Sequence, residues 1–155
     1  MVSVAYFDTS ALLKRYVTEA GTEWVNALLS SANAPLVFTS HLTVVEAACA
    51  FARRVREGNL SHQALDNLLR LFDYDVTYRY HILDLNPATI DAARDLALQQ
   101  PLRAYEAMHL ATAWLANQEL VRTDKLPLTF FSADGRLVGI AKATGLLTDN
   151  PHDHA

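Results

Sequence analysis

The stretch YFDTSALLKRY, residues 6–16, carries the chain from an apolar run into a helical pattern through one acidic residue, Asp8. The run from Val2 to Phe7 is typical of a buried strand, and apolar residues recur at helical spacing after Asp8. In an open parallel sheet, ligands bind just beyond the carboxyl ends of the strands, where Asp8 would lie. Because aspartate is also a favoured N-cap, Asp8 taken alone is explained by a structural role as well.

The rest of the chain repeats this alternation of short apolar runs and helical segments. The predicted strands cover residues 2–7, 36–39, 80–85, 128–132 and 146–148. The predicted helices begin after Asp8 and near Thr22, Thr43, Ser61, Pro87, Tyr105 and Asp134. The pattern predicts an α/β fold of three layers, in which helices flank a mostly parallel sheet of about four to five strands.

Composition predicts one compact soluble domain over residues 1–150, followed by a loose polar tail over residues 151–155. The chain has 155 residues, of which 51% are hydrophobic and 19% are charged. No apolar stretch approaches the roughly 20 residues that span a bilayer, and the apolar start lacks a basic region and a cleavage site. We therefore expect a cytoplasmic protein. The net charge of -4 argues weakly against nucleic-acid binding by charge alone.

Cys49 is the only cysteine, which excludes an intrachain disulfide and a cysteine-based zinc site. It falls in the predicted helix over residues 43–57, where Val44, Ala48, Phe51 and Val55 share one face. This position suits core packing better than catalysis.

Three further acids stand near the predicted strand ends or in an apolar helix. Glu46, in HLTVVEAA, follows the second strand, but Thr43 and Glu46 also have the spacing of a capping box. Glu106 lies in AYEAMHLATAWLA, an almost wholly apolar helix, where it either pairs with His109 or binds a cation. Asp134, in FFSADGRL, ends a strand and opens a helix as Asp8 does, so an N-cap explains it equally.

Taken together, these four carboxylates predict a metal site at the carboxyl edge of the sheet. Two unit charges about 4 Å apart repel by roughly 4 kcal/mol at an effective dielectric constant near 20, so a cluster of them favours a bound cation. Oxygen ligands without cysteine select Mg²⁺ or Mn²⁺. Such an ion activates water for phosphodiester hydrolysis.

The motifs YFDTSALLKRY, LTVVEAA, LRAYEAMHLATA and FFSADGRL, with the trailing ATGLLTDNP, follow one another as in PIN-domain ribonucleases. The chain most closely resembles the VapC toxins of toxin–antitoxin pairs. The resemblance implies that Asp8, Glu46, Glu106 and Asp134 hold Mg²⁺ or Mn²⁺, with the hydroxyls of Ser10 and Ser132 beside them. It also implies RNA cleavage that leaves a 5′-phosphate and a 3′-hydroxyl. The third acid of the family is most often aspartate, whereas this chain has glutamate.

The resemblance further implies a homodimer and a cognate VapB-like antitoxin that lies across the cleft. Tyr16, Trp24 and Leu28 are candidate docking positions, unless they belong to the core. Lys14, Arg15 and Arg53 are candidates for RNA phosphate contacts, although a solvated helix face has the same pattern. Two alternatives remain open: a catalytically impaired module that binds RNA or antitoxin, and a nuclease of RNA maturation that is not a toxin.

Overall fold

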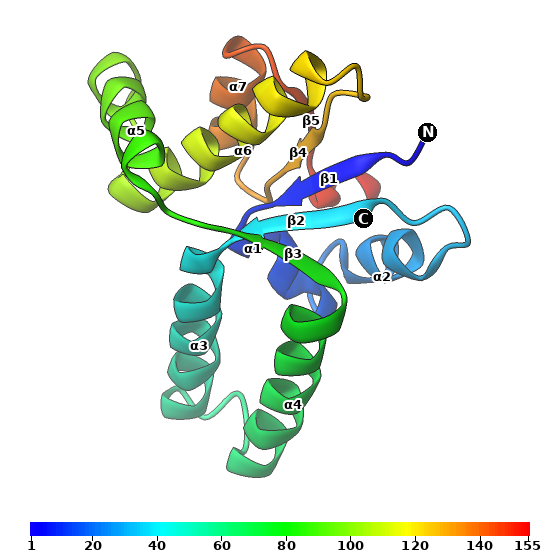
Figure 1. The fold of residues 1–155 in the computed structure, drawn as a ribbon. Helices are drawn as coiled ribbons and strands as arrows, with labels where there is room; N and C mark the ends of the chain where they lie inside the picture. The colour runs from blue at the N-terminus through cyan, green and yellow to red at the C-terminus, as the bar shows by residue number, and fades with distance from the viewer.

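The computed structural model describes residues 1–155 and has a central sheet of five parallel strands in the order β3-β2-β1-β4-β5 (Figure 1). The strands are β1 (Val4–Phe7), β2 (Leu36–Ser40), β3 (Tyr80–Leu83), β4 (Thr129–Phe131) and β5 (Leu147–Asp149). The helices are α1 (Thr9–Leu12), α2 (Thr22–Ser30), α3 (His41–Arg56), α4 (His62–Tyr78), α5 (Pro87–Gln99), α6 (Ala104–Arg122) and α7 (Gly135–Ala143). The predicted α/β class with a parallel sheet is confirmed.

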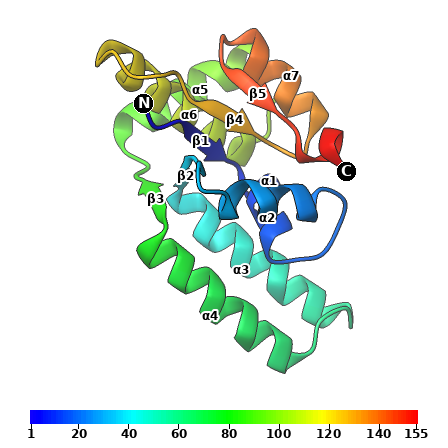
Figure 2. The same ribbon diagram turned by 90° about the vertical axis from the view of Figure 1, so that its right-hand side faces the viewer.

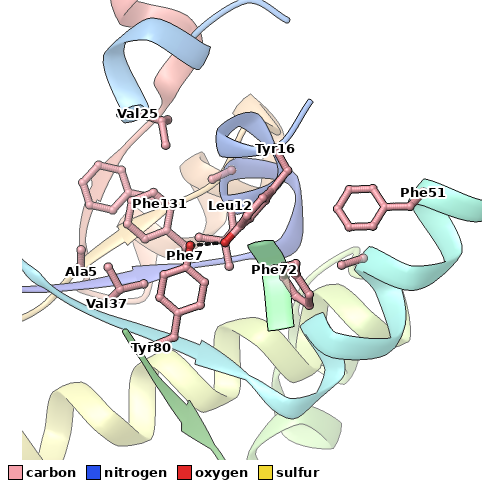
Figure 3. Close-up of a cluster of buried hydrophobic side chains, with 12 residues drawn as sticks. Ala5, Phe7, Leu12, Tyr16, Val25, Val37, Phe51, Phe72, Tyr80 and Phe131 are labelled. Atoms are coloured by element: carbon pink, nitrogen blue, oxygen red, sulfur yellow. Dashed lines mark hydrogen bonds between the residues drawn. The ribbon is translucent and has the colours of Figure 1, made fainter. Parts of the chain in front are cut away.

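Helices cover both faces of the sheet because residues on each strand alternate in direction. Tyr6 points to the side of α6 and α7, where it stacks on Phe130 with ring centroids 5.7 Å apart. Phe7 points to the side of α1 to α4 and stacks on Phe131 at 4.7 Å. Figure 3 shows this second cluster, in which the hydroxyls of Tyr16 and Tyr80 are hydrogen-bonded. No helix is both long and apolar enough to span a membrane.

All strands run in one direction, so their carboxyl ends meet at one edge of the sheet. Asp8 follows β1 there, and its amide donates to the carbonyl of Phe131 at 3.0 Å. Ser40 ends β2 at the same edge and caps α3 by accepting from the amide of Leu42 at 3.0 Å. Three chain segments that are distant in sequence are thereby held side by side at the point where the acids were expected.

Helix α3 is rotated relative to the predicted phase. Its buried residues are Thr43, Ala47 and Phe51, whereas Ala48 and Cys49 are exposed. One sequence position corresponds to about 100° of rotation. The cause is Thr43, whose hydroxyl is 2.8 Å from that of Thr39, a polar pairing that apolar periodicity does not detect. Helices α3 and α4 lie side by side and extend away from the sheet (Figures 1 and 2).

The C-terminal residues 151–155 were expected to be loose, and this expectation is wrong. Residues Pro151–His154 form a short 3₁₀ helix, η2, whose first residue is buried. The ring of His154 stacks on Trp24 with centroids 4.0 Å apart, and His152 Nε2 is 2.7 Å from Lys14 Nζ. These contacts attach the end of the chain to α2 and to the short 3₁₀ helix η1 (Leu13–Arg15).

Candidate active site

A cavity of about 430 Å³ lies at the carboxyl edge of the sheet, and all four predicted acids line it. Asp8 comes from the turn between β1 and α1, Glu46 from α3, Glu106 from the first turn of α6, and Asp134 from the turn between β4 and α7. The remaining lining side chains are Thr9, Ser10, Leu13, Ala50, Arg53, Tyr105, His109 and Leu137. The fold thus assembles the acids from four separate parts of the chain.

Asp8 is both an N-cap and a cavity residue. Its Oδ1 accepts hydrogen bonds from the amide of Ala11 at 2.9 Å and from the hydroxyl of Ser10 at 2.7 Å. Only 5% of the residue is exposed. Burial raises the pKa of this carboxyl, and the nearby His109 opposes that shift. A cation in the cavity would relieve the cost of holding the ionised form in a buried position.

A histidine and a threonine hold the side chain of Glu46. Its Oε1 lies 2.7 Å from Nε2 of His109 and accepts from the hydroxyl of Thr9 at 2.9 Å. The N-cap of α3 is Ser40, so the capping-box role suggested by Thr43 and Glu46 does not apply. Of the two alternatives for Glu106, the pair with His109 is not formed, because His109 contacts Glu46 instead.

Glu106 is almost fully buried, and both of its oxygens are engaged. Oε2 accepts from the backbone amide of Arg103 at 2.8 Å, which completes a capping box at the start of α6. Oε1 accepts from the guanidinium of Arg136 at 2.5 Å, and the same guanidinium donates to the carbonyl of Pro101 at 2.6 Å. The positively charged guanidinium of Arg136 therefore forms an ion pair with one of the four acids.

Asp134 caps α7, and two serines connect it to Asp8. Its Oδ1 accepts from the amides of Arg136 at 2.9 Å and Leu137 at 3.3 Å. Ser132 accepts from the amide of Asp134 at 3.1 Å, and its hydroxyl is 3.4 Å from that of Ser10. The two hydroxyls expected beside the acids are thus located between Asp8 and Asp134.

The chemistry of this donor set fits a hard divalent ion, since four carboxylates line one cavity and no cysteine does. The side chains do not form a finished coordination shell: no group of three or more histidine, cysteine, aspartate or glutamate side chains is arranged to hold a metal ion. Glu106 does not complete such a shell because its Oε1 already accepts a hydrogen bond from Arg136. Ligation by Glu106 through Oε1 requires this ion pair to open.

The three basic residues proposed for RNA contact behave differently. Arg53 lines the acidic cavity. Lys14 is buried, with 1% of the residue exposed, and its ammonium donates to the carbonyl of Ala20 at 2.7 Å. Arg15 donates to the buried Asp75 at 2.8 Å, away from the cavity. The expectation that Lys14 and Arg15 flank the acids is therefore corrected, because both serve the interior of the fold.

The aromatic and apolar docking candidates are mainly part of the core. Tyr16 is buried, and Trp24 and Leu28 are partly buried against the same cluster. Thr9 and Arg136 belong to the site but were not predicted from the sequence. Thr9 sits beside Asp8 in the first motif, and Arg136 stands two residues after Asp134, so proximity to the acids was the available indication.

Comparison with known proteins agrees with this geometry. The family model of the PIN domain matches residues 5–126. The chain is 31% identical over 110 residues to Ribonuclease VapC45 of Mycobacterium tuberculosis. The matched region covers 71% of this chain and 74% of the relative. Among solved structures, FitAcB from Neisseria gonorrhoeae has a TM-score of 0.69 at 17% identity and covers 96% of this chain and 97% of that one. A toxin-antitoxin complex from Klebsiella pneumoniae has a TM-score of 0.60 at 18% identity, over 95% of this chain and 97% of that one. The chain belongs to the PIN-domain family, and within it to the VapC group.

Proposed function

We propose that this protein is a divalent-metal-dependent endoribonuclease that hydrolyses RNA phosphodiester bonds. The observation that carries the proposal is the meeting of Asp8, Glu46, Glu106 and Asp134 in one cavity of a VapC-type chain. Mg²⁺ or Mn²⁺ held there would supply an activated water and offset the charge that grows on the phosphodiester. The relative VapC45 is named a ribonuclease, which supports the same chemistry.

The chain's own residues would orient the reaction. Ser10 and the amide of Ala11 fix Asp8 Oδ1, so that the other oxygen of this carboxylate is available to a cation. Arg53 lines the cavity with 72% of its side chain exposed, which suits contact with an RNA phosphate next to the scissile bond. The ion pair between Arg53 and Glu57, at 2.8 Å, competes with this phosphate contact. Because the ion pair is exposed, water weakens it.

The proposed biological role is that of the toxin in a VapBC-type pair. A VapB-like antitoxin would then be the partner, and a homodimer the functional unit. The toxin-antitoxin complex from Klebsiella pneumoniae, which shares the fold, supports this assignment. Growth arrest on expression, relieved by a small protein encoded beside the gene, would distinguish a toxin from a nuclease of RNA maturation.

The test of the chemistry is cleavage of a mixed RNA substrate by the purified protein in EDTA, Mg²⁺ or Mn²⁺, followed by analysis of the product ends. We expect cleavage only with a divalent ion, and products with a 5′-phosphate and a 3′-hydroxyl. Cleavage in EDTA with cyclic phosphate ends would contradict the proposal, because it would indicate attack by the RNA 2′-hydroxyl. Mn²⁺ binding without cleavage would indicate a very narrow RNA specificity, whereas absence of Mn²⁺ binding would favour the RNA- or antitoxin-binding module.

A further inference from the structure

The only buried histidine of the chain, His109, lies on α6 between a tyrosine of the central strand and the Glu46 carboxylate. Nδ1 is 2.8 Å from the hydroxyl of Tyr6, and Nε2 is 2.7 Å from Oε1 of Glu46. The imidazole is 2% exposed and lines the acidic cavity. A residue placed only to fill the core would not need to direct its second nitrogen to a cavity carboxylate.

The hydrogen-bond directions along this chain of groups follow from the chemistry of its ends. An ionised carboxylate only accepts hydrogen bonds, so the 2.7 Å contact between Nε2 and Oε1 of Glu46 requires a proton on Nε2. In the neutral imidazole Nδ1 then carries no proton and accepts from the hydroxyl of Tyr6 at 2.8 Å. In the imidazolium form both nitrogens carry protons, so Nε2 donates to Glu46 in either case.

Glu46 has little else to hold it. Its side chain is 25% exposed and extends from α3, a helix that projects away from the sheet (Figure 1). The hydroxyl of Thr9 is its other hydrogen-bond donor, on the same oxygen, Oε1. Both of these donors bind Oε1, which leaves Oε2 as the oxygen of Glu46 that is available to a ligand. Hydrogen bonds of this kind orient metal-ligating carboxylates and commonly change metal affinity by about 10- to 100-fold.

We propose that His109 is a positioning residue, which holds Glu46 Oε1 through Nε2–H and thereby presents Oε2 to the divalent ion. The inference rests on the proposed function, because it assumes that Glu46 ligates a cation. It assigns a role to a side chain outside the four acids, and it makes Tyr6 the donor to Nδ1.

A matched pair of amides tests the role of His109. In His109→Gln the amide nitrogen takes the place of Nε2 and keeps the donor to Glu46. In His109→Asn the shorter amide takes the place of Nδ1, which keeps the contact with Tyr6 and loses the one with Glu46. Mn²⁺ affinity, measured by calorimetry without RNA, should fall about tenfold or more in the Asn variant and recover most of this loss in the Gln variant. Tyr16→Phe, which removes a buried hydroxyl elsewhere, should bind Mn²⁺ as the unchanged protein does.

Equal Mn²⁺ affinity in the Asn, Gln and unchanged proteins would overturn the role of His109 while leaving the metal site intact. Absence of Mn²⁺ binding by the unchanged protein would overturn the metal site itself, and this inference with it. Should the variants fail to fold, nitrogen NMR of the unchanged protein decides the matter, since His109 is the one buried histidine. A proton on Nε2 and a shift on Mg²⁺ addition are expected; a neutral ring protonated only on Nδ1 would overturn the proposal.

Discussion

Two features of Asp8 have opposite effects on the pKa of its carboxyl. As the cap of α1 it accepts hydrogen bonds that favour the carboxylate form, whereas its burial disfavours charge and raises its pKa. The folded protein therefore binds a proton at Asp8 more tightly than the unfolded chain does. Consequently the contribution of Asp8 to the free energy of unfolding falls as pH rises from the ordinary carboxyl pKa through the raised one.

For Asp8→Asn we expect loss of RNA cleavage together with unchanged or higher stability in EDTA at neutral pH. Asparagine caps helices as well as aspartate does, and it carries no buried charge. The gain should disappear at acidic pH, where Asp8 itself is protonated. Urea unfolding at a series of pH values from acidic to neutral measures this. A variant less stable than the unchanged protein at neutral pH would show that the charge stabilises the fold.

Glu106 replaces the aspartate that is usual at its position in the family. Its longer side chain reaches both the Arg103 amide and the Arg136 guanidinium. For Glu106→Asp we expect RNA cleavage to persist with Mg²⁺, because one methylene less still leaves a carboxylate in the cavity. Cleavage rates at several Mg²⁺ concentrations check this prediction. Complete inactivity of a folded variant would mean that the site is built around the longer side chain.

Helices α6 and α7 are linked by Arg136, which lies on α7 and pairs with Glu106 on α6. The guanidinium binds Glu106 Oε1 and lies 3.7 Å from Asp134 Oδ2, so it neutralises two of the four acids. A divalent ion must compete with it for Glu106. With 45% of its side chain exposed, Arg136 contributes modestly to stability, since water weakens such pairs.

We expect Arg136→Gln to bind Mn²⁺ several-fold more tightly and to lose only a little folding stability, because water weakens an exposed ion pair. The gain follows from removal of a competing cation, and the loss from a weaker link between α6 and α7. Calorimetry and urea unfolding measure the two effects. Arg122→Gln is the matched control, because its guanidinium pairs with Glu119 on the exposed side of α6. Weaker Mn²⁺ binding in Arg136→Gln would show that Arg136 helps to build the site.

Element positions were largely predictable from the sequence, whereas helix phase and side-chain partners were not. Periodicity and turn residues located every strand near its observed bounds, because these are local properties. The rotation of α3 depends on Thr39 and Thr43, a contact between a strand and a helix. Likewise, helical spacing suggested Glu106 as a partner for His109 on the same helix. In the fold, His109 contacts Glu46 on α3 instead.

At the scale of the whole molecule, the parallel sheet explains why sequence alone could locate the candidate site. Acids that follow strand ends must gather at one edge when all strands run the same way. That argument predicted the meeting of Asp8, Glu46 and Asp134, and the apolar surroundings of Glu106 pointed to the fourth. It could not predict the buried roles of Lys14 and Arg15, because each has a partner 60 or more positions away, His152 for Lys14 and Asp75 for Arg15.

The proposed metal-dependent RNA hydrolysis requires all four carboxylates. The most direct measurement compares RNA cleavage in Mn²⁺ by the unchanged protein and by Asp8→Asn, Glu46→Gln, Glu106→Gln and Asp134→Asn. Asp66→Asn, an exposed acid on α4, is the control. We expect each of the four amide variants to fold and to lose cleavage, while the control and the unchanged protein cut RNA only with the metal. Cleavage that persists in EDTA, or in all four variants, would contradict this expectation.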